Sequence, residues 1–335
     1  MAVNAHTHLY SGLVPLGMPA PAREPASFVE ILELVWWKLD RALDARTLRA
    51  SARFYVAESI LAGCHGLVDH HESPNFIEGS LDVIADACQN LGMPALLCYG
   101  ATERNDDREE AARGIEECRR FIRDNHRPLV KGVIGLHASF TVSDETIRAA
   151  AAVARDTGTV LHVHVAEDAA DVRDAKERGY AGVIDRLRAL DALIPRSIFA
   201  HGVHLTRDEV DLVSRAGIWL VQNPRSNRGN KVGYPAWLRR SDNVALGTDG
   251  YPATMDEECS ELQALAEEHG ESASVARARL SGSSLLFAEV FGRAAEILAS
   301  ESRLCDGRLA GGDLAEIRAT AAECAKDLWQ RMESL

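Results

Sequence analysis

The stretch TVLHVHVAE, residues 159–167, interleaves apolar residues with two histidines and ends on a glutamate. A short run of this kind, rich in β-branched residues and flanked by helical patterns, predicts a buried strand of a parallel sheet. Residues two apart on a strand point to the same side, so His162 and His164 face the same way, with His162 one layer deeper. Glu167 follows at the predicted end of the strand, so chemically active side chains gather there.

Seven further runs of this kind lie along the chain, with helical patterns between them. The helical segments carry apolar residues at three- and four-residue spacing, and Thr206 with Glu209 predicts a capping box. Strands that alternate with helices form parallel sheets, and eight repeats predict a closed (β/α)8 TIM barrel. The seven runs are AVNAHTH (2–8), GLVDHH (66–71), PALLCYG (94–100), LVKGVIGLH (129–137), SIFAHGV (197–203), GIWLVQN (217–223) and NVALGTD (243–249).

We expect residues 1–335 to form one barrel domain with a C-terminal helical extension over about residues 272–335, broken near LCDGRLAGGD. The net charge of −13 argues against a nucleic-acid partner, which would need a basic patch. Seven cysteines without a CxxC pair indicate reduced, buried thiols. The sequence has no apolar run of membrane-spanning length and no signal peptide, so we expect no membrane partner and a cytoplasmic location.

The carboxyl ends of the predicted strands carry the residues that suggest a metal site. In a (β/α)8 barrel the functional side chains lie at these ends. His6 and His8 end the first strand and face the same side, and one further histidine and a carboxylate would complete a four-coordinate site. His164 and Asp249 are the natural candidates. We therefore expect one divalent cation, zinc with iron(II) as the alternative, that lowers the pKa of a water to about 7.

Two more strand ends supply groups for proton transfer. Glu167 and His201 would lie beside the activated water. For His201 two roles stay open: contact with the water, which we favour, or service as a fifth ligand.

Four residues are candidates for substrate contacts. Trp36 and Trp37 follow a long proline-rich loop, VPLGMPAPAREP (14–25), and could stack on a flat heterocycle or simply pack in a helix. Of His70 and His71, one could reach the pocket, and we prefer His71. Asn223 ends the seventh strand and is a further candidate.

The motifs HVHVAE, AHGVHL and GTDG, together with the HxH of the first strand, resemble those of the amidohydrolase superfamily, in its mononuclear aminohydrolase and chlorohydrolase branch. WWKLDRALD, DHHESP and NPRSN are similar to the SsnA-type aminohydrolases. The resemblance implies metal binding by His6, His8, His164 and Asp249. It further implies a proton shuttle at Glu167, a water contact at His201 and a substrate contact at His137. Asp249, besides binding the metal, could take a proton from the activated water.

The chain departs from this pattern in two places. Members of the branch usually carry a small β-sandwich, whereas here few residues precede the HxH and ESRLCDGRLAGGDLAE stands in place of a strand-rich tail. We therefore expect a barrel without the sandwich. Its first strand would be covered by a C-terminal helix or by another subunit, so a homo-oligomer is considered. Gln222 stands where many relatives have histidine, which affects substrate contacts at the seventh strand.

The resulting functional hypothesis is a metal-dependent aminohydrolase, or deaminase, that releases ammonia from a small nitrogen heterocycle. Hydrolysis of a cyclic amide C–N bond or removal of chloride from a ring is the first alternative, because the same activated water serves each reaction. A non-catalytic barrel that binds a metal or a ligand is the second. Glu167 and His201 argue against the second, since a site that only binds needs no proton shuttle.

Overall fold

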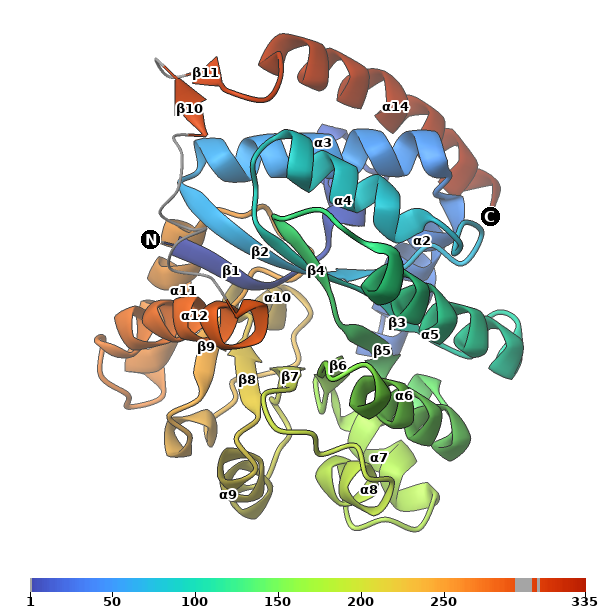
Figure 1. Ribbon diagram of the computed structural model, residues 1–335. Helices are drawn as coiled ribbons and strands as arrows, with labels where there is room; N and C mark the ends of the chain where they lie inside the picture. The colour runs from blue at the N-terminus through green and yellow to red at the C-terminus, as the bar shows by residue number, and fades with distance from the viewer. Residues whose placement is uncertain (1, 293–302, 306–307) are drawn as a thin grey trace.

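The barrel wall is a sheet of parallel strands that follow one another around the axis. The computed structural model describes residues 2–292, 303–305 and 308–335, and Figure 1 shows its strands inside a ring of helices. The sheet order is β1-β2-β3-β5-β6-β7-β8-β9, with β4 paired to β3. The strands are β1 (Ala2–Thr7), β2 (Cys64–His71), β3 (Ala95–Ala101), β4 (Val130–Gly132), β5 (Ile134–Ala138), β6 (Leu161–Val165), β7 (Ile198–His201), β8 (Trp219–Gln222) and β9 (Val244–Leu246).

The predicted TIM barrel is confirmed, and one predicted strand is divided. The run LVKGVIGLH forms β4 and β5, which pair with the lower and upper parts of β3. The barrel closes where β1 meets the segment after β9: Thr7 and Asp249 form a parallel bridge. The backbone N–H groups of Thr248 and Asp249 both donate to the His6 carbonyl at 3.0 Å. The first and last strand ends therefore lie side by side.

Helices follow the strands and cover the outside of the barrel. Asp44, Ser143 and Thr206 cap their helices, and the predicted capping box of Thr206 and Glu209 is present. The α-helices are α1 (Phe28–Ile31), α2 (Trp37–Ala42), α3 (Ala45–Leu61), α4 (Ser80–Asn90), α5 (Asp107–Asp124), α6 (Asp144–Asp156), α7 (Ala169–Glu177), α8 (Val183–Ala189), α9 (Arg207–Arg215), α10 (Pro224–Gly229), α11 (Met255–Glu268), α12 (Val275–Phe291) and α14 (Leu314–Ser334). Short helical turns are η1 (Leu9–Ser11), η2 (Val14–Leu16), η3 (Leu32–Trp36), η4 (Ser139–Thr141) and η5 (Leu238–Arg240).

The C-terminal segment contributes the helices α12 and α14 to the outside of the barrel. α12 packs on β1 and β9, so the first strand is covered by a helix of this chain, as one of the two sequence-based alternatives had it. Gly282 of α12 permits this contact, because a Cβ there would overlap the carbonyl oxygen of Val244. α14 packs farther out, on α3 and α2 (Figure 1). At the predicted break, strands β10 (Leu304–Cys305) and β11 (Arg308–Leu309) pair in antiparallel fashion. Residues 293–302 and 306–307 of the predicted extension lie outside the described residues.

Within residues 2–292, 303–305 and 308–335, no helix has both the length and the apolar character required to cross a membrane. Of the cysteine side chains that the structure describes, all are free thiols and all but that of Cys259 are buried.

Candidate metal centre and active site

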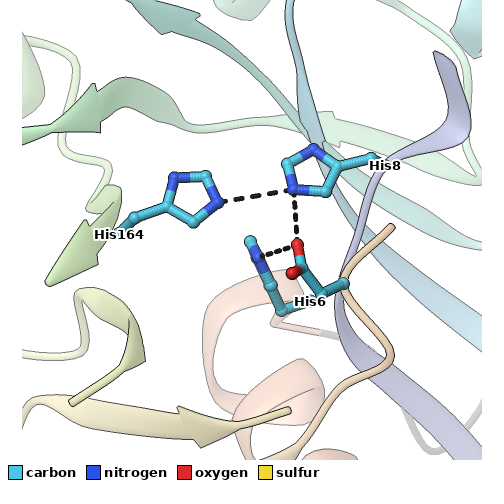
Figure 2. A group of neighbouring side chains, drawn as sticks. His6, His8 and His164 are labelled. Carbon is cyan, nitrogen blue, oxygen red and sulfur yellow. Dashed lines mark hydrogen bonds and ion pairs between the residues drawn. The ribbon is translucent and has the colours of Figure 1, made fainter. Parts of the chain in front are cut away.

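Three histidines and one aspartate converge at the mouth of the barrel. His6 lies on β1 and His8 just beyond it, while His164 lies on β6 and Asp249 follows β9. His8 Nε2 lies 2.8 Å from Asp249 Oδ1, and His6 Nε2 lies 3.4 Å from the same oxygen. His164 Nε2 is 3.4 Å from His8 Nε2, and Figure 2 shows the three imidazoles turned toward one another. All four potential ligand atoms lie within 4.8 Å of one another.

These residues fit a divalent cation. Zinc–nitrogen bonds of 2.0–2.1 Å in a tetrahedral site place neighbouring ligand atoms about 3.4 Å apart, which is close to the separations in this cluster. His6 Nε2 is buried without a hydrogen-bond partner, although a polar atom in that position normally has one. Three imidazole nitrogens and one carboxylate oxygen suit zinc or iron(II).

Backbone carbonyls orient two of the histidines. His8 Nδ1 lies 2.5 Å from the carbonyl oxygen of His70, and His164 Nδ1 lies 2.6 Å from that of His137. A carbonyl only accepts, so each Nδ1 carries a hydrogen, and in the neutral imidazole the lone pair is on Nε2. This is the tautomer that binds a metal through Nε2.

His162 orients the remaining histidine. Its Nε2 lies 2.9 Å from His6 Nδ1, and its Nδ1 lies 3.7 Å from the Cys98 thiol. The sequence predicted that His162 lies one layer deeper in the barrel than His164. In the structure it lies beneath His6, where it directs His6 Nε2 toward the other three ligand atoms.

Burial and the aspartate set the charges in this cluster. Burial lowers the pKa of His6 to about 3 and that of His164 well below its usual value, so both imidazoles are neutral, as ligands must be. Burial alone would also lower the pKa of His8, but the neighbouring carboxylates of Asp249 and Glu72 outweigh burial and raise that pKa. Asp249 stays ionised, because its contacts with His6 and His8, at 3.4 and 2.8 Å, outweigh burial and hold its pKa well below the ordinary value.

Glu167 and His201 lie next to the other oxygen of Asp249. His201 Nε2 is buried without a hydrogen-bond partner, 3.5 Å from Glu167 Oε2 and 4.0 Å from Asp249 Oδ2. It belongs to a second group with these two carboxylates and not to the four-residue cluster, which favours a water contact over a fifth ligand. Burial, reinforced by the charge of Asp249, raises the pKa of Glu167 well above its usual value, so this carboxyl retains a proton readily.

The short helix α10 supports the proton-transfer groups. Ser226 Oγ donates to Asp249 Oδ2, which leaves Oδ1 for the histidine cluster. Asn227 Oδ1 accepts from His201 Nδ1 at 2.9 Å, so His201 Nε2 presents a lone pair.

Asn230, which caps α10, completes this support. Its Nδ2 donates to Glu167 Oε1 at 3.3 Å and to Ser226 Oγ at 3.2 Å. Sequence reasoning used NPRSN only for its resemblance and assigned no role to Ser226, Asn227 or Asn230. Their three- and four-residue spacing on one helix is a signal in retrospect, since it places side chains on one face.

Three strand ends turn through strained backbone beside the cluster. Ala166, His201 and Asp249 have φ values of 48°, 73° and 55°. Left-handed backbone costs a non-glycine residue about 1 kcal/mol or more, and such residues cluster at functional sites.

A cavity opens above the cluster and contains several of the predicted substrate contacts. Trp36, Trp37 and His137 line it, beside His8, His164, Glu167 and Asp249. The centroid of the Trp37 ring lies 6.3 Å from that of the His137 ring. The Arg104 guanidinium lies over the Trp37 ring, 4.7 Å from its centroid. Tyr10, Phe28, Leu32 and Phe140 add apolar surface.

Two predicted substrate contacts lie outside this lining. His71 is buried, bonds Ser73 Oγ through Nε2 at 2.7 Å and packs against Tyr99. Neighbouring residues of a strand face opposite sides, so His70 points inward and His71 outward, contrary to the preference for His71. Asn223 is also fully buried, with its Nδ2 3.4 Å from His201 Nδ1.

Asp40 and Glu72 are acidic residues of the cavity lining to which the sequence analysis assigned no role. Asp40 stands in the quoted motif WWKLDRALD and Glu72 in DHHESP. Glu72 lies two residues after His70, and that spacing is the signal that could have placed its side chain on the inner face.

The fold and this site define a (β/α)8 barrel with a candidate metal centre at its mouth. The sequence profile of the Amidohydrolase family matches residues 2–295. The chain therefore belongs to the amidohydrolase family.

Two relatives and one solved structure illustrate the match. The chain is 27% identical to a 5-methylthioadenosine/S-adenosylhomocysteine deaminase of Thermococcus sibiricus, over 74% of this chain and 57% of that protein. It is also 27% identical to an 8-oxoguanine deaminase of Pseudomonas aeruginosa, over 67% and 52%. It thus spans little more than half of these relatives. The crystal structure of an adenosine deaminase from Xanthomonas campestris with bound zinc superposes with a TM-score of 0.80 at 20% identity, covering 100% of this chain and 85% of that one.

The contact between Ser226 and Asp249 yields a first prediction. Ser226→Ala removes the donor that fixes the orientation of the carboxylate, so we expect the zinc affinity to fall about 10- to 100-fold, as when other supports of metal ligands are removed. Competition with a chromophoric chelator measures this. Ser260→Ala on the exposed side of α11 is the matched control and should bind zinc like the unchanged protein. Equal affinities in both variants would contradict the role of Ser226.

The proton shared by His8 and Asp249 yields a second prediction. In the metal-free protein the raised pKa of His8 keeps that imidazole protonated, whereas a ligand must lose its proton. Binding of zinc should therefore release about one proton near pH 7, and affinity should fall as the pH is lowered. Calorimetry in buffers of different ionisation enthalpy counts the protons. A binding enthalpy that does not vary with the buffer would show that His8 releases no proton when zinc binds, and would contradict this prediction.

Proposed function

We propose that this protein is a metal-dependent aminohydrolase that converts an aminated nitrogen heterocycle, such as an aminopurine, into the oxo compound with release of ammonia. The observation that carries the proposal is the juxtaposition of the His6, His8, His164 and Asp249 cluster with Glu167 and His201. Four of these six side chains, those of His8, His164, Glu167 and Asp249, line one cavity. Family membership and the deaminase names of the relatives support it.

We assign the cation to His6, His8, His164 and Asp249, with zinc favoured over iron(II) because nitrogen-rich four-coordinate sites suit zinc. When bound, it supplies a Lewis acid that lowers the pKa of a water to about 7. A zinc-containing structure in the same fold agrees with this choice.

The remaining steps belong to side chains of this chain. Asp249 Oδ2 and His201 Nε2 face the same space, where they orient the attacking water and accept its proton. Glu167 holds its proton in the ground state and delivers it to the ring nitrogen next to the attacked carbon. The proton accepted by Asp249 or His201 then passes to the amino group, which leaves as ammonia, and the remaining hydroxyl proton returns to Glu167 as the oxo group forms.

The cavity wall binds the ring. Trp36 and Trp37 offer flat faces for stacking on a heterocycle. His137 lies between the Trp37 ring and the metal cluster, where it contacts the edge of the substrate.

The test is ammonia release by zinc-loaded protein from a panel of 5′-methylthioadenosine, adenosine, guanine and 8-oxoguanine. Glu167→Gln should lower the rate about 10²- to 10⁴-fold, the usual contribution of a general acid–base residue, while the zinc content stays at one per chain. Glu177→Gln, an exposed substitution on α7, is the matched control and should leave the rate unchanged. Protein that holds one zinc and releases ammonia from no member of the panel would contradict the proposed substrate class, and full activity of Glu167→Gln would contradict the mechanism.

A further inference from the structure

Glu72 is a buried carboxylate that the catalytic steps above do not use. It follows β2, is 2% exposed and lines the cavity. Its Oε1 lies 2.6 Å from His70 Nδ1, which fixes one side of the group. Its Oε2 is buried without a hydrogen-bond partner. The nearest imidazole nitrogen, His8 Nδ1 at 3.5 Å, already donates its hydrogen to the His70 carbonyl.

The surroundings hold the carboxylate in place. His70 is itself fixed, because its Nε2 lies 3.0 Å from the Leu136 carbonyl oxygen. Gly100 lies against the pair, and a Cβ there would overlap both Glu72 Oε1 and His70 Cε1. Glu72 therefore occupies a space that is open only because residue 100 is a glycine. It lies beside the edge of the His8 ring that faces away from Asp249.

The chemistry of the lining favours a donor at this point. Asp40 is similarly buried, and while its Oδ2 accepts from Arg104 Nη2 at 2.8 Å, its Oδ1 has no partner. Aromatic rings of Tyr10, Trp36 and Trp37 lie on the same lining, and aromatic faces attract cations. Among the described residues, no lysine or arginine lines this cavity.

We propose that Glu72 is a specificity-determining residue whose Oε2 accepts a hydrogen bond from an amino or amidinium group of the substrate. The inference deepens the proposed function and rests on it, since it concerns the same cavity. A buried acceptor without a partner is costly, and a site built around such an acceptor rejects ligands that lack the matching donor. The substrate is therefore a heterocycle with an N–H donor group besides the amino group that leaves.

Binding of three small aromatic probes to zinc-loaded protein tests this separately from turnover. Benzamidine is a cationic donor, benzamide a neutral one, and methyl benzoate has no N–H group. We expect calorimetry to give benzamidine at least about tenfold tighter binding than benzamide, with methyl benzoate weakest. Equal affinities for all three probes would overturn the proposal.

Variants connect this order to Glu72. In Glu72→Gln the amide oxygen can accept from His70, which turns the amide N–H₂ toward the cavity and replaces an acceptor by a donor. The preference for benzamidine should then disappear. Glu72→Asp keeps the negative charge but moves the acceptor oxygen back from the cavity, so it should weaken benzamidine binding. This variant replaces Glu72→Gln in the test if Glu72→Gln does not fold. Glu78→Gln makes the same change on the exposed surface and should preserve the order.

The outcomes separate the two claims. An unchanged preference in a Glu72 variant with normal melting temperature and zinc content would overturn the role of Glu72. Ammonia release without any preference among the probes would overturn this inference alone. A Glu72-dependent preference in a protein that releases no ammonia would support the inference and contradict the proposed function.

Discussion

Closure of the barrel between β1 and the segment after β9 is the constraint on which the site depends. Two backbone hydrogen bonds to the His6 carbonyl join these ends, which lie more than 240 residues apart in the sequence. They bring Asp249 to within 2.8 Å of His8. The Asn4 side chain reinforces the seam by bonding both the backbone and the hydroxyl of Thr248. A loosened seam would separate the carboxylate from two of its three histidines.

The charges around this seam explain why a cation belongs there. Asp249 is an ionised carboxylate in a buried cluster of imidazoles, and burial of a charge is costly unless a partner compensates it. In the metal-free protein a proton on His8 is that partner. A divalent cation compensates the same carboxylate and also uses the lone pairs of His6 and His164. α10 meanwhile holds the outer oxygen of Asp249 together with His201 and Glu167, so metal binding and proton transfer share one support.

The alternation of apolar runs and helical patterns was sufficient to predict the barrel, because each strand is buried and bounded by clear helix signals. The period-two geometry of strands also brought His6 and His8 together with His164 and Asp249, since all lie at strand ends. On β2 the sequence did not indicate which of the two histidines faces inward. His71 was the preferred candidate, whereas in the structure His70 faces the cluster. The sequence did not predict the helical side chains that support the site, such as Ser226 and Asn230, because their positions depend on how α10 packs after β8. The sequence did not predict a role for Glu72, because only the folded structure shows that one of its carboxylate oxygens has no hydrogen-bond donor.

The most direct test of the central claim, that four side chains from three strand ends hold one divalent cation, is a crystal structure of zinc-loaded protein with anomalous diffraction at the zinc edge. The account predicts one strong peak about 2.0–2.2 Å from Nε2 of His6, His8 and His164 and from Oδ1 of Asp249. A principal peak among His8, His70 and Glu72, the neighbouring group with ligand-type atoms, would contradict it, as would stoichiometric zinc bound away from the barrel mouth.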